Sequence, residues 1–421
     1  MRQYPKYKDS GIQWIGQIPE GWRVKRYKHC FITSTGLNIA KSDLTDAGVA
    51  VISYGQIHAK INTRTHLSDD LVRFIPKELV KGKETCKLQR NDFVFADTSE
   101  DLEGCGNAAF IDSDREIYAG YHTIIARPVI SGEIKYLAYL FTTDVWRKQI
   151  REHVAGVKVN SITQKLLNEC VLLLPPTTEQ QAIVCYLDTK TAMIDQSINL
   201  LEQQKTDLQK YRTVLISQTV TRGLIPNAKL KDSGIQWIGH IPEGWEVDKV
   251  KNHILSIKSG DSIKYDKQNT DGEYPLYGGG ALIGYVDKYN TQVGDILIGR
   301  VGANCGCVTE ITQPSWATDN ALVITPKIST KYLVYILNTA NLNKLNTSNA
   351  QPLITATKIK DFSIPIAPIS EQQAIVDYLD TKTAKIDETI RRIDEQINDL
   401  RAYRTAIISE VVTGKIDVRN N

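Results

Sequence analysis

The chain has 421 residues, of which 42% are hydrophobic and 24% are charged. This length predicts two or three domains, and the composition is that of a globular protein, not of a disordered, fibrous or disulfide-framed one. The net charge of +3, from 51 basic and 48 acidic residues, neither indicates nor excludes a nucleic-acid partner. No run of about 18 apolar residues is present, so we expect no helix that crosses a membrane.

The seven cysteines predict reduced thiols, and hence a cytoplasmic location, because an odd number in so long a chain does not suit a disulfide frame. The N-terminal segment lacks the apolar core of a secretory signal. Cys305 and Cys307 form the closest pair, but no second pair or nearby histidine completes a zinc site. We therefore expect no metal site in this chain.

Two internal repeats determine the expected architecture. Residues 8–22 return as residues 231–245 with fourteen of fifteen positions identical, at an offset of 223. Residues 179–195 return as residues 371–387 with fifteen of seventeen identical, at an offset of 192. Because the two offsets differ, variable blocks of unequal length, roughly 23–176 and 246–368, must separate the repeated segments.

The chain is therefore expected to consist of a first globular domain (1–176), a central helix (177–222), a second globular domain (223–369) and a C-terminal helix (370–421). The predicted fold class is α+β, with two mixed α/β domains joined by two long helices that pair as an antiparallel coiled coil with pseudo-twofold symmetry. Nearly identical frames with dissimilar inserts suggest one scaffold that presents two different binding surfaces.

Both repeated helices carry apolar residues at alternating spacings of four and three, which is the heptad seam of a coiled coil. Two unrelated amphipathic core helices are the alternative. Lys205 interrupts the first seam and either fixes the register or extends to water. Capping boxes are expected at Thr178 and Ser370. The apolar seam residues are Leu187, Ile194, Ile198, Leu201, Leu208 and Leu215 in the first helix and Leu379, Ile386, Ile390, Ile393, Ile397, Leu400 and Ile407 in the second.

Glycines at 223 and 414 are expected to end the two helices. The segment after Gly414 resembles the segment after Gly223, which leads into the second copy of residues 8–22. The C-terminus should therefore lie near the N-terminus. The repeated tryptophans, Trp14, Trp22, Trp237 and Trp245, are expected to anchor turns by burial, with stacking on a nucleobase as the alternative.

The variable blocks are expected to contain short strands, such as 92–96, 108–111 and 123–126 in the first and 295–299, 307–309 and 321–325 in the second. Each block should end with a helical piece, around 134–154 and 330–345. The glycine-rich stretch 277–285 imitates a dinucleotide fingerprint but lacks its spacing.

No catalytic constellation is apparent, because the histidines are scattered and no HExxH, GxSxG or P-loop motif occurs. Four acidic residues, Asp97, Glu100, Asp101 and Glu103, cluster as nuclease carboxylates would. Because no companion basic motif follows, a solvated acidic loop is the favoured interpretation.

Taken together, these residues resemble the DNA-specificity subunit of type I restriction–modification systems. The likeness is carried by Asp-Ser-Gly-Ile-Gln-Trp-Ile-Gly with Ile-Pro-Glu-Gly-Trp, twice, and by Glu-Gln-Gln-Ala-Ile-Val before a long helix, twice. Tyr-Pro-Leu-Tyr-Gly-Gly-Gly in the second block and the related segments 161–180 and 353–372 add to it. The resemblance extends over essentially the whole chain.

The resemblance implies that each globular domain is a target recognition domain that reads one half of a bipartite, asymmetric site in double-stranded DNA. The helices would set the gap between the half-sites and dock two modification subunits. Methylation of adenine with S-adenosylmethionine, and cleavage by a motor-nuclease subunit with ATP and Mg²⁺, would belong to those partners. The chain itself would be non-catalytic and hold no cofactor.

Residues that contact bases are nominated from polar side chains at expected turns, because such groups match base edges. In the first domain they are Ser53, Tyr54, Gln56, Arg64, Thr98, Ser99, Tyr121 and His122. In the second domain they are Tyr277, Arg300, Asn304, Thr318, Asp319 and Asn320. The alternatives for Arg300 are a phosphate contact and an internal ion pair.

Other functions remain open on the sequence alone. One is a specificity subunit of a modification-only methyltransferase. Another, from a different class, is a coiled-coil adaptor that binds proteins and has no DNA preference. A single-chain methyltransferase-nuclease is disfavoured by the missing motifs.

Overall fold

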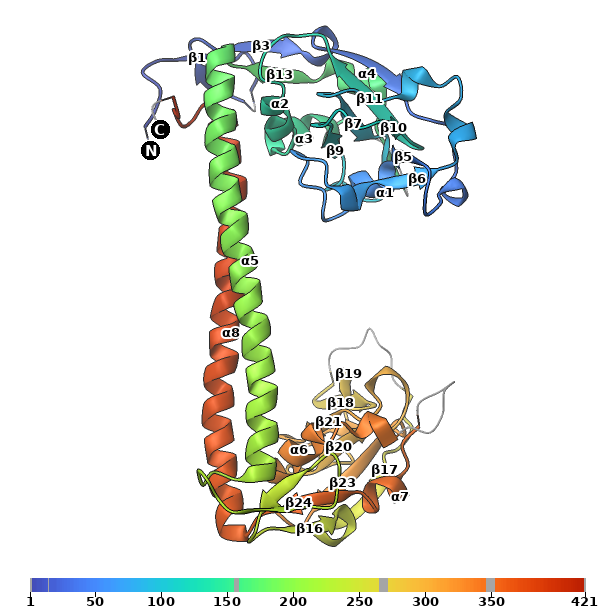
Figure 1. Cartoon of the computed structure of the whole chain (residues 1–421), viewed down its shortest axis with the longest axis vertical. Coiled ribbons are helices and arrows are strands. Elements are labelled where there is room, and N and C mark those ends of the chain that lie inside the picture. The colour runs from blue at the N-terminus through green and yellow to red at the C-terminus, as the bar shows by residue number, and fades with distance from the viewer. Residues whose placement is uncertain (1, 14, 155–158, 265–271, 346–352, 420–421) are drawn as a thin grey trace. The chain divides into compact units, whose positions relative to one another are not determined.

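The computed structural model describes residues 2–13, 15–154, 159–264, 272–345 and 353–419. The chain divides into two units. Unit 1 comprises Met1–Leu200 and Gln396–Asn421, and unit 2 comprises Leu201–Glu395. Each unit contains one globular domain and one portion of each long helix, α5 and α8 (Figure 1).

The domain of unit 1 contains two sheets. The four-stranded antiparallel sheet has the order β4 (Phe31–Thr35), β11 (Thr123–Pro128), β7 (Phe93–Ala96) and β9 (Ala108–Phe110). In the three-stranded sheet, β5 (Val49–Ile52) is parallel to β10 (Ile117–Ala119) and antiparallel to β6 (Arg73–Ile75).

The domain of unit 2 has the same topology, although the two sequences share little identity. Its four-stranded sheet has the order β17 (Ile254–Ser259), β23 (Ala321–Pro326), β20 (Ile296–Gly299) and β21 (Val308–Glu310). In its three-stranded sheet, β18 (Tyr274–Gly278) is parallel to β22 (Trp316–Ala317) and antiparallel to β19 (Ala281–Val286). The expected strands of both blocks are therefore confirmed.

Alternation of side chains along the central strand explains how each core forms. In β7, Phe93 and Phe95 pack with the aromatic ring of Phe141, while Val94 and Ala96 belong to the core cluster that includes residues of β5 and β10. All four side chains of β7 are buried. A strand whose two faces are both covered has a continuous run of apolar residues in its sequence, because neither face meets water.

The glycine-rich stretch is a β-hairpin and not a nucleotide-binding loop. Strands β18 and β19 are joined by Gly279 and Gly280, which have φ angles of +62° and +89°. Positive φ at both central residues is the requirement of the tight hairpin turn that matches the twist of the strands, and glycine meets it without steric cost.

The helical pieces at the ends of the blocks are interrupted. The first consists of α2 (Lys135–Phe141) and α3 (Asp144–Arg151), and the second of α6 (Thr330–Thr339) and η8 (Leu342–Leu345). In unit 1 the side chains of Thr142 and Thr143 donate hydrogen bonds to backbone carbonyls of α2. Such bonds compete with helix continuation.

Each domain leads into its long helix through a strand pair. In unit 1, β13 (Val171–Leu174) pairs with β3 (Arg23–Arg26), and in unit 2, β24 (Ser363–Ile366) pairs with β16 (Glu246–Lys249). The helices α4 (Gln164–Glu169) and α7 (Ala356–Lys360) precede these strands. Thr163 and Thr355 cap the two helices with their side-chain oxygens.

The long helices are α5 (Thr177–Arg222) and α8 (Ile369–Val412). The expected capping boxes are wrong, because both helices begin earlier than predicted. The carbonyls of Pro176 and Pro368 accept the first helical hydrogen bonds, so Thr178 and Ser370 lie inside the first turn. The fold-class prediction is confirmed, with α5 and α8 pairing antiparallel within each unit.

Glycines end both helices as expected. Gly223 and Gly414 both have a φ of +74°, the left-handed conformation that commonly terminates a helix. A side chain at residue 414 would also collide with the ring of Pro19, whose Cδ would lie 2.4 Å from the added Cβ. Beyond it, the amide of Asp417 donates to the carbonyl of Arg2 at 2.8 Å. The two chain ends are therefore neighbours in unit 1, as the repeat predicts.

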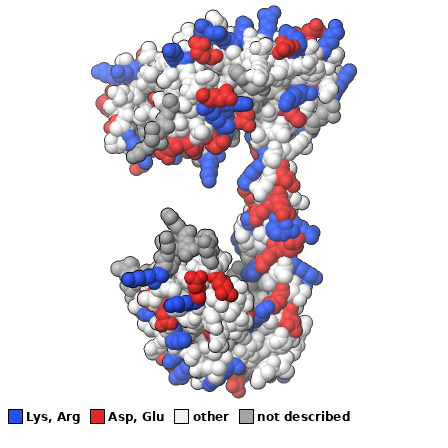
Figure 2. Space-filling model, turned by 180° about the vertical axis from the view of Figure 1, so that it is seen from behind, with Lys and Arg blue, Asp and Glu red and all other residues white. Residues whose placement is uncertain are grey.

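Among the described residues, neither the long helices nor any shorter helix combines the length and apolar character that a membrane span needs. On the face shown in Figure 2, acidic and basic side chains are interspersed along the long helices. This mixture agrees with the small net charge of the chain.

Candidate nucleic-acid interface

Backbone hydrogen bonds show which residues of the two domains are equivalent. After β10, the amide of Gly120 donates to the carbonyl of Ile52, and after β22 the amide of Thr318 donates to the carbonyl of Tyr277. In the four-stranded sheets, Ala96 is opposite Thr123, and Gly299 is opposite Ala321. These pairings make Tyr121 and His122 of the first domain equivalent to Asp319 and Asn320 of the second. Residues nominated separately from sequence thus occupy matching positions.

We call the residues at these strand ends turn cluster 1 and turn cluster 2. Turn cluster 1 comprises Ser53, Tyr54, Asp97, Thr98, Ser99, Tyr121 and His122. Turn cluster 2 comprises Tyr277, Gly278, Gly279, Arg300, Val301, Asn304, Thr318, Asp319 and Asn320. Each cluster therefore combines loops from both sheets of its domain.

Aromatic contacts hold turn cluster 1 together. The ring of Tyr54 lies 5.5 Å from that of His58, 6.1 Å from that of Tyr121 and 6.0 Å from that of His122. The Tyr54 hydroxyl donates to Glu100 at 3.2 Å, and Nδ1 of His122 lies 3.1 Å from Oδ1 of Asp97. This surface presents aromatic rings together with hydrogen-bonding groups, which suits contact with nucleobases.

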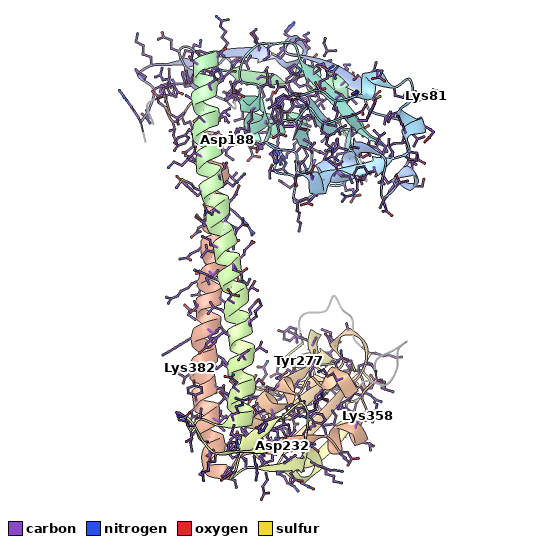
Figure 3. All side chains as sticks on the ribbon, viewed as in Figure 1. Lys81, Asp188, Asp232, Tyr277, Lys358 and Lys382 are labelled. Atoms are coloured by element: carbon purple, nitrogen blue, oxygen red, sulfur yellow. The ribbon has the colours of Figure 1, made fainter. Side chains whose placement is uncertain are left out.

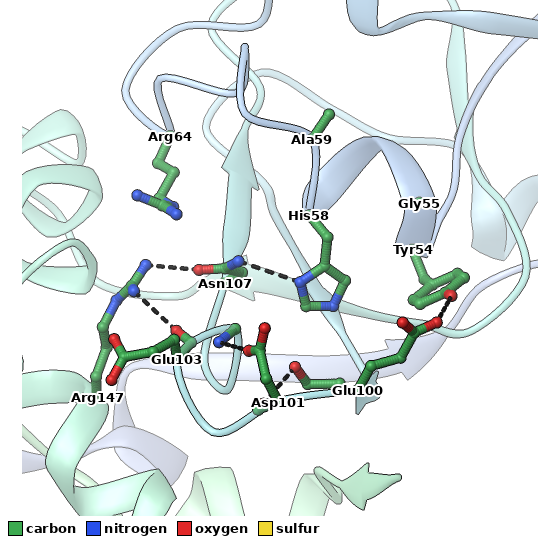
Figure 4. A pocket seen from close by; sticks show the side chains of 12 residues that line it. Tyr54, Gly55, His58, Ala59, Arg64, Glu100, Asp101, Glu103, Asn107 and Arg147 are labelled. Atoms are coloured by element: carbon green, nitrogen blue, oxygen red, sulfur yellow. Dashed lines mark hydrogen bonds between the residues drawn. The ribbon is translucent and has the colours of Figure 1, made fainter. Parts of the chain in front are cut away.

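A polar pocket of about 520 Å³ adjoins turn cluster 1 (Figure 4). Its lining includes Tyr54, Ser99, Arg64 and Arg147. Burial lowers the pKa of Arg147 to about 10 and also lowers the pKa of Arg64. The Arg147 guanidinium donates to Oδ1 of Asn107 at 2.6 Å and to the carbonyl of Glu103 at 3.1 Å. Arg147 thereby fixes the acidic loop against the domain.

The acidic residues of this loop do not converge on one point. Asp97 faces His122, Glu100 accepts from Tyr54, the Asp101 carboxylate accepts from the Gly104 amide, and Glu103 pairs with Arg151. Within the part of the chain that the structure describes, no group of three or more His, Cys, Asp or Glu side chains is arranged to hold a metal ion. The acidic loop is therefore tied to separate partners.

Turn cluster 2 converges around the glycine hairpin (Figure 3 labels Tyr277). An added Cβ at Gly279 would lie 3.6 Å from the carbonyl oxygens of Asn320 and Val301 and 3.9 Å from Cβ of Asn304. The amide of Arg300 donates to the Asn320 carbonyl at 3.0 Å. All six nominated residues of the second domain are thus close together, with Asp319 and Asn320 exposed.

The structure buries three of the nominated side chains. Ser53, Ser99 and Thr318 are 0%, 2% and 6% exposed. Ser99 donates to the carbonyl of Asp101, and Thr318 accepts from the amide of Asn320. The expectation that these side chains reach a base is corrected on this ground, because each lies beneath the surface. Gln56 accepts from the amide of Ser53, which shapes the turn into helix α1 (Tyr54–Ile57).

The repeated tryptophans anchor the helices in both units. Trp22 is fully buried and its Nε1 donates to Glu179 at 2.9 Å. Trp245 is 1% exposed and its Nε1 donates to Glu371 at 3.0 Å. Stacking on a base does not apply to these two residues, since their rings are covered by protein. Trp237 stacks on Phe362 in unit 2, and Trp14 lies outside the described residues.

A second anchor was missed from the sequence. In unit 1, Lys135 and Tyr139 of α2 contact the Asp188 carboxylate at 2.8 and 2.6 Å, and Figure 3 labels Asp188 on α5. In unit 2, Lys331 and Tyr335 of α6 contact Asp380 at 2.6 and 2.7 Å. These side chains attach each domain to its long helix. The shared pattern Lys-Tyr-Leu-x-Tyr in the two variable blocks was a signal for it.

The helix pairing repeats in the same way. Arg404 pairs with Asp195 at 2.9 Å in unit 1, and Arg212 pairs with Asp387 at 2.9 Å in unit 2. The offset of 192 relates Asp195 to Asp387 and Arg212 to Arg404, so the two ion pairs are equivalent in the repeat. The thirteen apolar seam residues are buried or half-buried. Lys205 pairs with Asp394 at 2.6 Å, and the residues equivalent to this pair are Ile397 and Glu202. The ion pair is therefore unsymmetrical.

Comparison with known proteins agrees with this geometry. The family model described as the type I restriction modification DNA specificity domain matches residues 19–208 and 242–399. These segments make up most of the chain, so the protein belongs to this family.

Two distant relatives match nearly the full length of this chain. The chain is similar to the StySPI specificity subunit of a type I restriction enzyme from Salmonella potsdam, with 23% identity across 95% of this chain and 90% of the relative. It is similar to the EcoKI specificity subunit from Escherichia coli K12, with 22% identity and the same two coverages.

Two solved structures resemble the fold. One is a chain from a structural study of complex assembly and conformational transition in the type I R-M system. It has a TM-score of 0.72 and 17% identity, covering 95% of this chain and 99% of that chain. The other is the HsdS subunit from Thermoanaerobacter tengcongensis, with a TM-score of 0.51 and 17% identity over 95% and 98%. At these identities the likeness concerns the fold alone.

Proposed function

We propose that this chain is the sequence-specific DNA-recognition subunit of a type I restriction–modification complex. Each domain reads one half of a bipartite, asymmetric site in double-stranded DNA, through residues in and beside its turn cluster that are not buried. The helices set the gap between the half-sites and dock two modification subunits. The chain acts in the cytoplasm of a prokaryote, where its DNA substrate is found.

One observation carries this proposal: two domains of the same topology present different residues at equivalent turn positions, on a frame that is repeated almost without change. Tyr121 and His122 in unit 1 correspond to Asp319 and Asn320 in unit 2. Two copies of one reader would need a symmetric site, whereas two unlike readers select an asymmetric one. The repeated frame, by contrast, suits a partner that binds in two copies.

The proposed contact residues are the nominated ones that are not buried. They are Tyr54, Gln56, Arg64, Thr98, Tyr121 and His122 in the first domain and Tyr277, Arg300, Asn304, Asp319 and Asn320 in the second. Their side chains offer donors, acceptors and aromatic rings for base edges or for the sugar-phosphate backbone.

The helix lengths support a role in spacing. The 46 residues of α5 correspond to about 69 Å at 1.5 Å per residue, which is about 20 base pairs of DNA at 3.4 Å each. The unsymmetrical pair of Lys205 and Asp394 favours one register, because a shift of either helix separates the two charges. A fixed register gives a fixed gap.

In this proposal the catalytic reactions are carried out by the partner subunits. The modification subunits bind S-adenosylmethionine and methylate adenine, and a motor-nuclease subunit uses ATP and Mg²⁺ to translocate and cut DNA. This chain supplies the DNA sequence preference and the assembly surface. Its anchors, such as Trp22 with Glu179 in unit 1 and Trp245 with Glu371 in unit 2, hold each domain on the helices.

The test is a map of methylated adenine across the host genome, with and without this gene, by single-molecule sequencing. Loss of one bipartite motif with a fixed gap on deletion is the expected result. Exchange of residues 23–176 for the first domain of another family member should then change one half-site only. A change in both half-sites would refute the assignment of one domain to one half-site.

The map also distinguishes the remaining possibilities. If no motif changes although this chain and a modification subunit are expressed, the purified complex is tested on random DNA. Binding without sequence preference would identify a protein-binding adaptor and refute the proposal. Methylation of the motif without cleavage of unmethylated DNA would identify a modification-only complex.

A further inference from the structure

The position directly after the central strand carries opposite charges in the two domains. Asp97 follows β7 and Arg300 follows β20. The amide of Asp97 donates to the His122 carbonyl at 3.2 Å, and the amide of Arg300 donates to the Asn320 carbonyl at 3.0 Å.

The backbone carbonyls of Asp97 and Arg300 also accept hydrogen bonds from equivalent amides. The carbonyl of Asp97 accepts from the amide of Ile162 at 2.7 Å, and that of Arg300 accepts from the amide of Ile354 at 2.9 Å. Donor and acceptor partners are therefore equivalent in both domains. The same backbone position presents a carboxylate in one reader and a guanidinium in the other.

Within the described part of the chain, both the Asp97 and the Arg300 side chains retain hydrogen-bonding groups that have no partner. The Asp97 side chain is 34% exposed, and its Oδ1 lies 3.1 Å from Nδ1 of His122. Nη1 of Arg300 donates to the Ser259 hydroxyl at 2.8 Å. Nε of Arg300 is buried and has no hydrogen-bond partner in the described part of the chain, where no carboxylate forms an ion pair with this guanidinium either. The Ser259 hydrogen bond orients the guanidinium and leaves Nη2 available.

We propose that this position determines the base type that each domain accepts. Asp97 accepts a hydrogen bond from an exocyclic amino group in the major groove, N4 of cytosine or N6 of adenine. Arg300 donates to O6 and N7 of guanine. The inference rests on the proposed function and assigns its chemistry, because a carboxylate is an acceptor only and a guanidinium is a donor only.

One substitution in each domain, which alters the hydrogen-bonding groups of the side chain, tests this proposal. Asp97→Asn replaces one acceptor oxygen by a donor at constant size. Arg300→Lys keeps the positive charge but removes the planar fork, and these two cations are not interchangeable at a bidentate contact. Controls of the same chemistry are Asp46→Asn, before the opposite end of β5, and Arg222→Lys, at the end of α5; both residues are exposed.

The assay selects bound sequences from DNA randomised across the bipartite site, using the complex reconstituted with its modification subunits. Asp97→Asn should reduce the preference at one position of the first half-site by about 5-fold or more, and the identity of the base lost there distinguishes cytosine from adenine. Arg300→Lys should do the same at a guanine of the second half-site. The half-site that is read by the domain without the substitution shows whether each variant complex is folded and assembled.

Two results overturn the inference while the proposed function stands. One is a wild-type bipartite motif that both variants reproduce at every position. The other is uniform weakening by Arg300→Lys across all sequences, with a salt dependence reduced by about one ion, which indicates a phosphate contact. A wild-type complex with no motif overturns the proposed function itself, and the inference with it.

Discussion

Truncation of one seam leucine to alanine should destabilise the unit that contains it. Leu187 in unit 1 and Leu379 in unit 2 are related by the offset of 192, and both side chains are 0% exposed. Truncation of a fully buried leucine to alanine costs about 3 kcal/mol, as lost apolar transfer plus a cavity that the neighbours only partly fill. Leu200, which is 59% exposed on the same helix, provides the control, and its truncation should cost less than about 0.5 kcal/mol.

Amide hydrogen exchange resolves this cost by region, which a single melting curve does not do for a chain with two units. A loss of about 3 kcal/mol accelerates exchange through local opening by about 100-fold. We expect Leu187→Ala to show this acceleration in residues 183–195 of α5, and Leu379→Ala to show it in residues 375–387 of α8. Equal acceleration by Leu187→Ala and Leu200→Ala would refute the assignment of stability to the buried seam.

Three further predictions concern the ends, anchors and spacing of the helices. Gly414→Ala should destabilise unit 1 by about 2 to 3 kcal/mol, because the added Cβ collides with Pro19. Gly11→Ala, at a residue with a similar φ of +73° but open space around it, should cost about 1 kcal/mol. Amide hydrogen exchange in unit 1 compares the two variants, and equal losses would contradict the clash. Tyr335→Phe should cost about 1 to 2 kcal/mol because Asp380 loses a hydrogen bond of 2.7 Å, whereas Tyr289→Phe, at a residue 53% exposed, should be neutral in urea unfolding. Deletion of one matched heptad from both α5 and α8 should shorten the gap in the methylated motif and keep both half-sites, while deletion from α5 alone should abolish assembly; an unchanged gap would refute the spacing role.

Periodicity and repetition made much of the fold predictable. Long helices with a four-three pattern can bury that seam only against a similar partner, so two copies of the pattern predict their own pairing. Gly223 and Gly414 marked both helix ends, because few other residues adopt a positive φ. The start was misjudged at Thr178, since α5 begins at Thr177 and the carbonyl of Pro176 accepts the first helical hydrogen bonds.

The likeness of the two domains was hidden from the sequence. A strand buried on both faces requires only apolar side chains of suitable volume, so Phe93 to Ala96 and Ile296 to Gly299 fill the same place without identity. The anchors on Asp188 and Asp380 left a trace, the Lys-Tyr-Leu-x-Tyr pattern, but its meaning depended on which carboxylate lies opposite.

The family and the helix seam could be predicted from the sequence, because they depend on local pattern and on repetition along the chain. The exposure of the polar residues could be read only from the folded chain. Ser53 and Ser99 look like surface residues in sequence and are buried, whereas Asp97, taken from sequence as part of an acidic loop, occupies the position of Arg300. Burial and equivalence are set by contacts between segments far apart in the chain, and no local pattern encodes them.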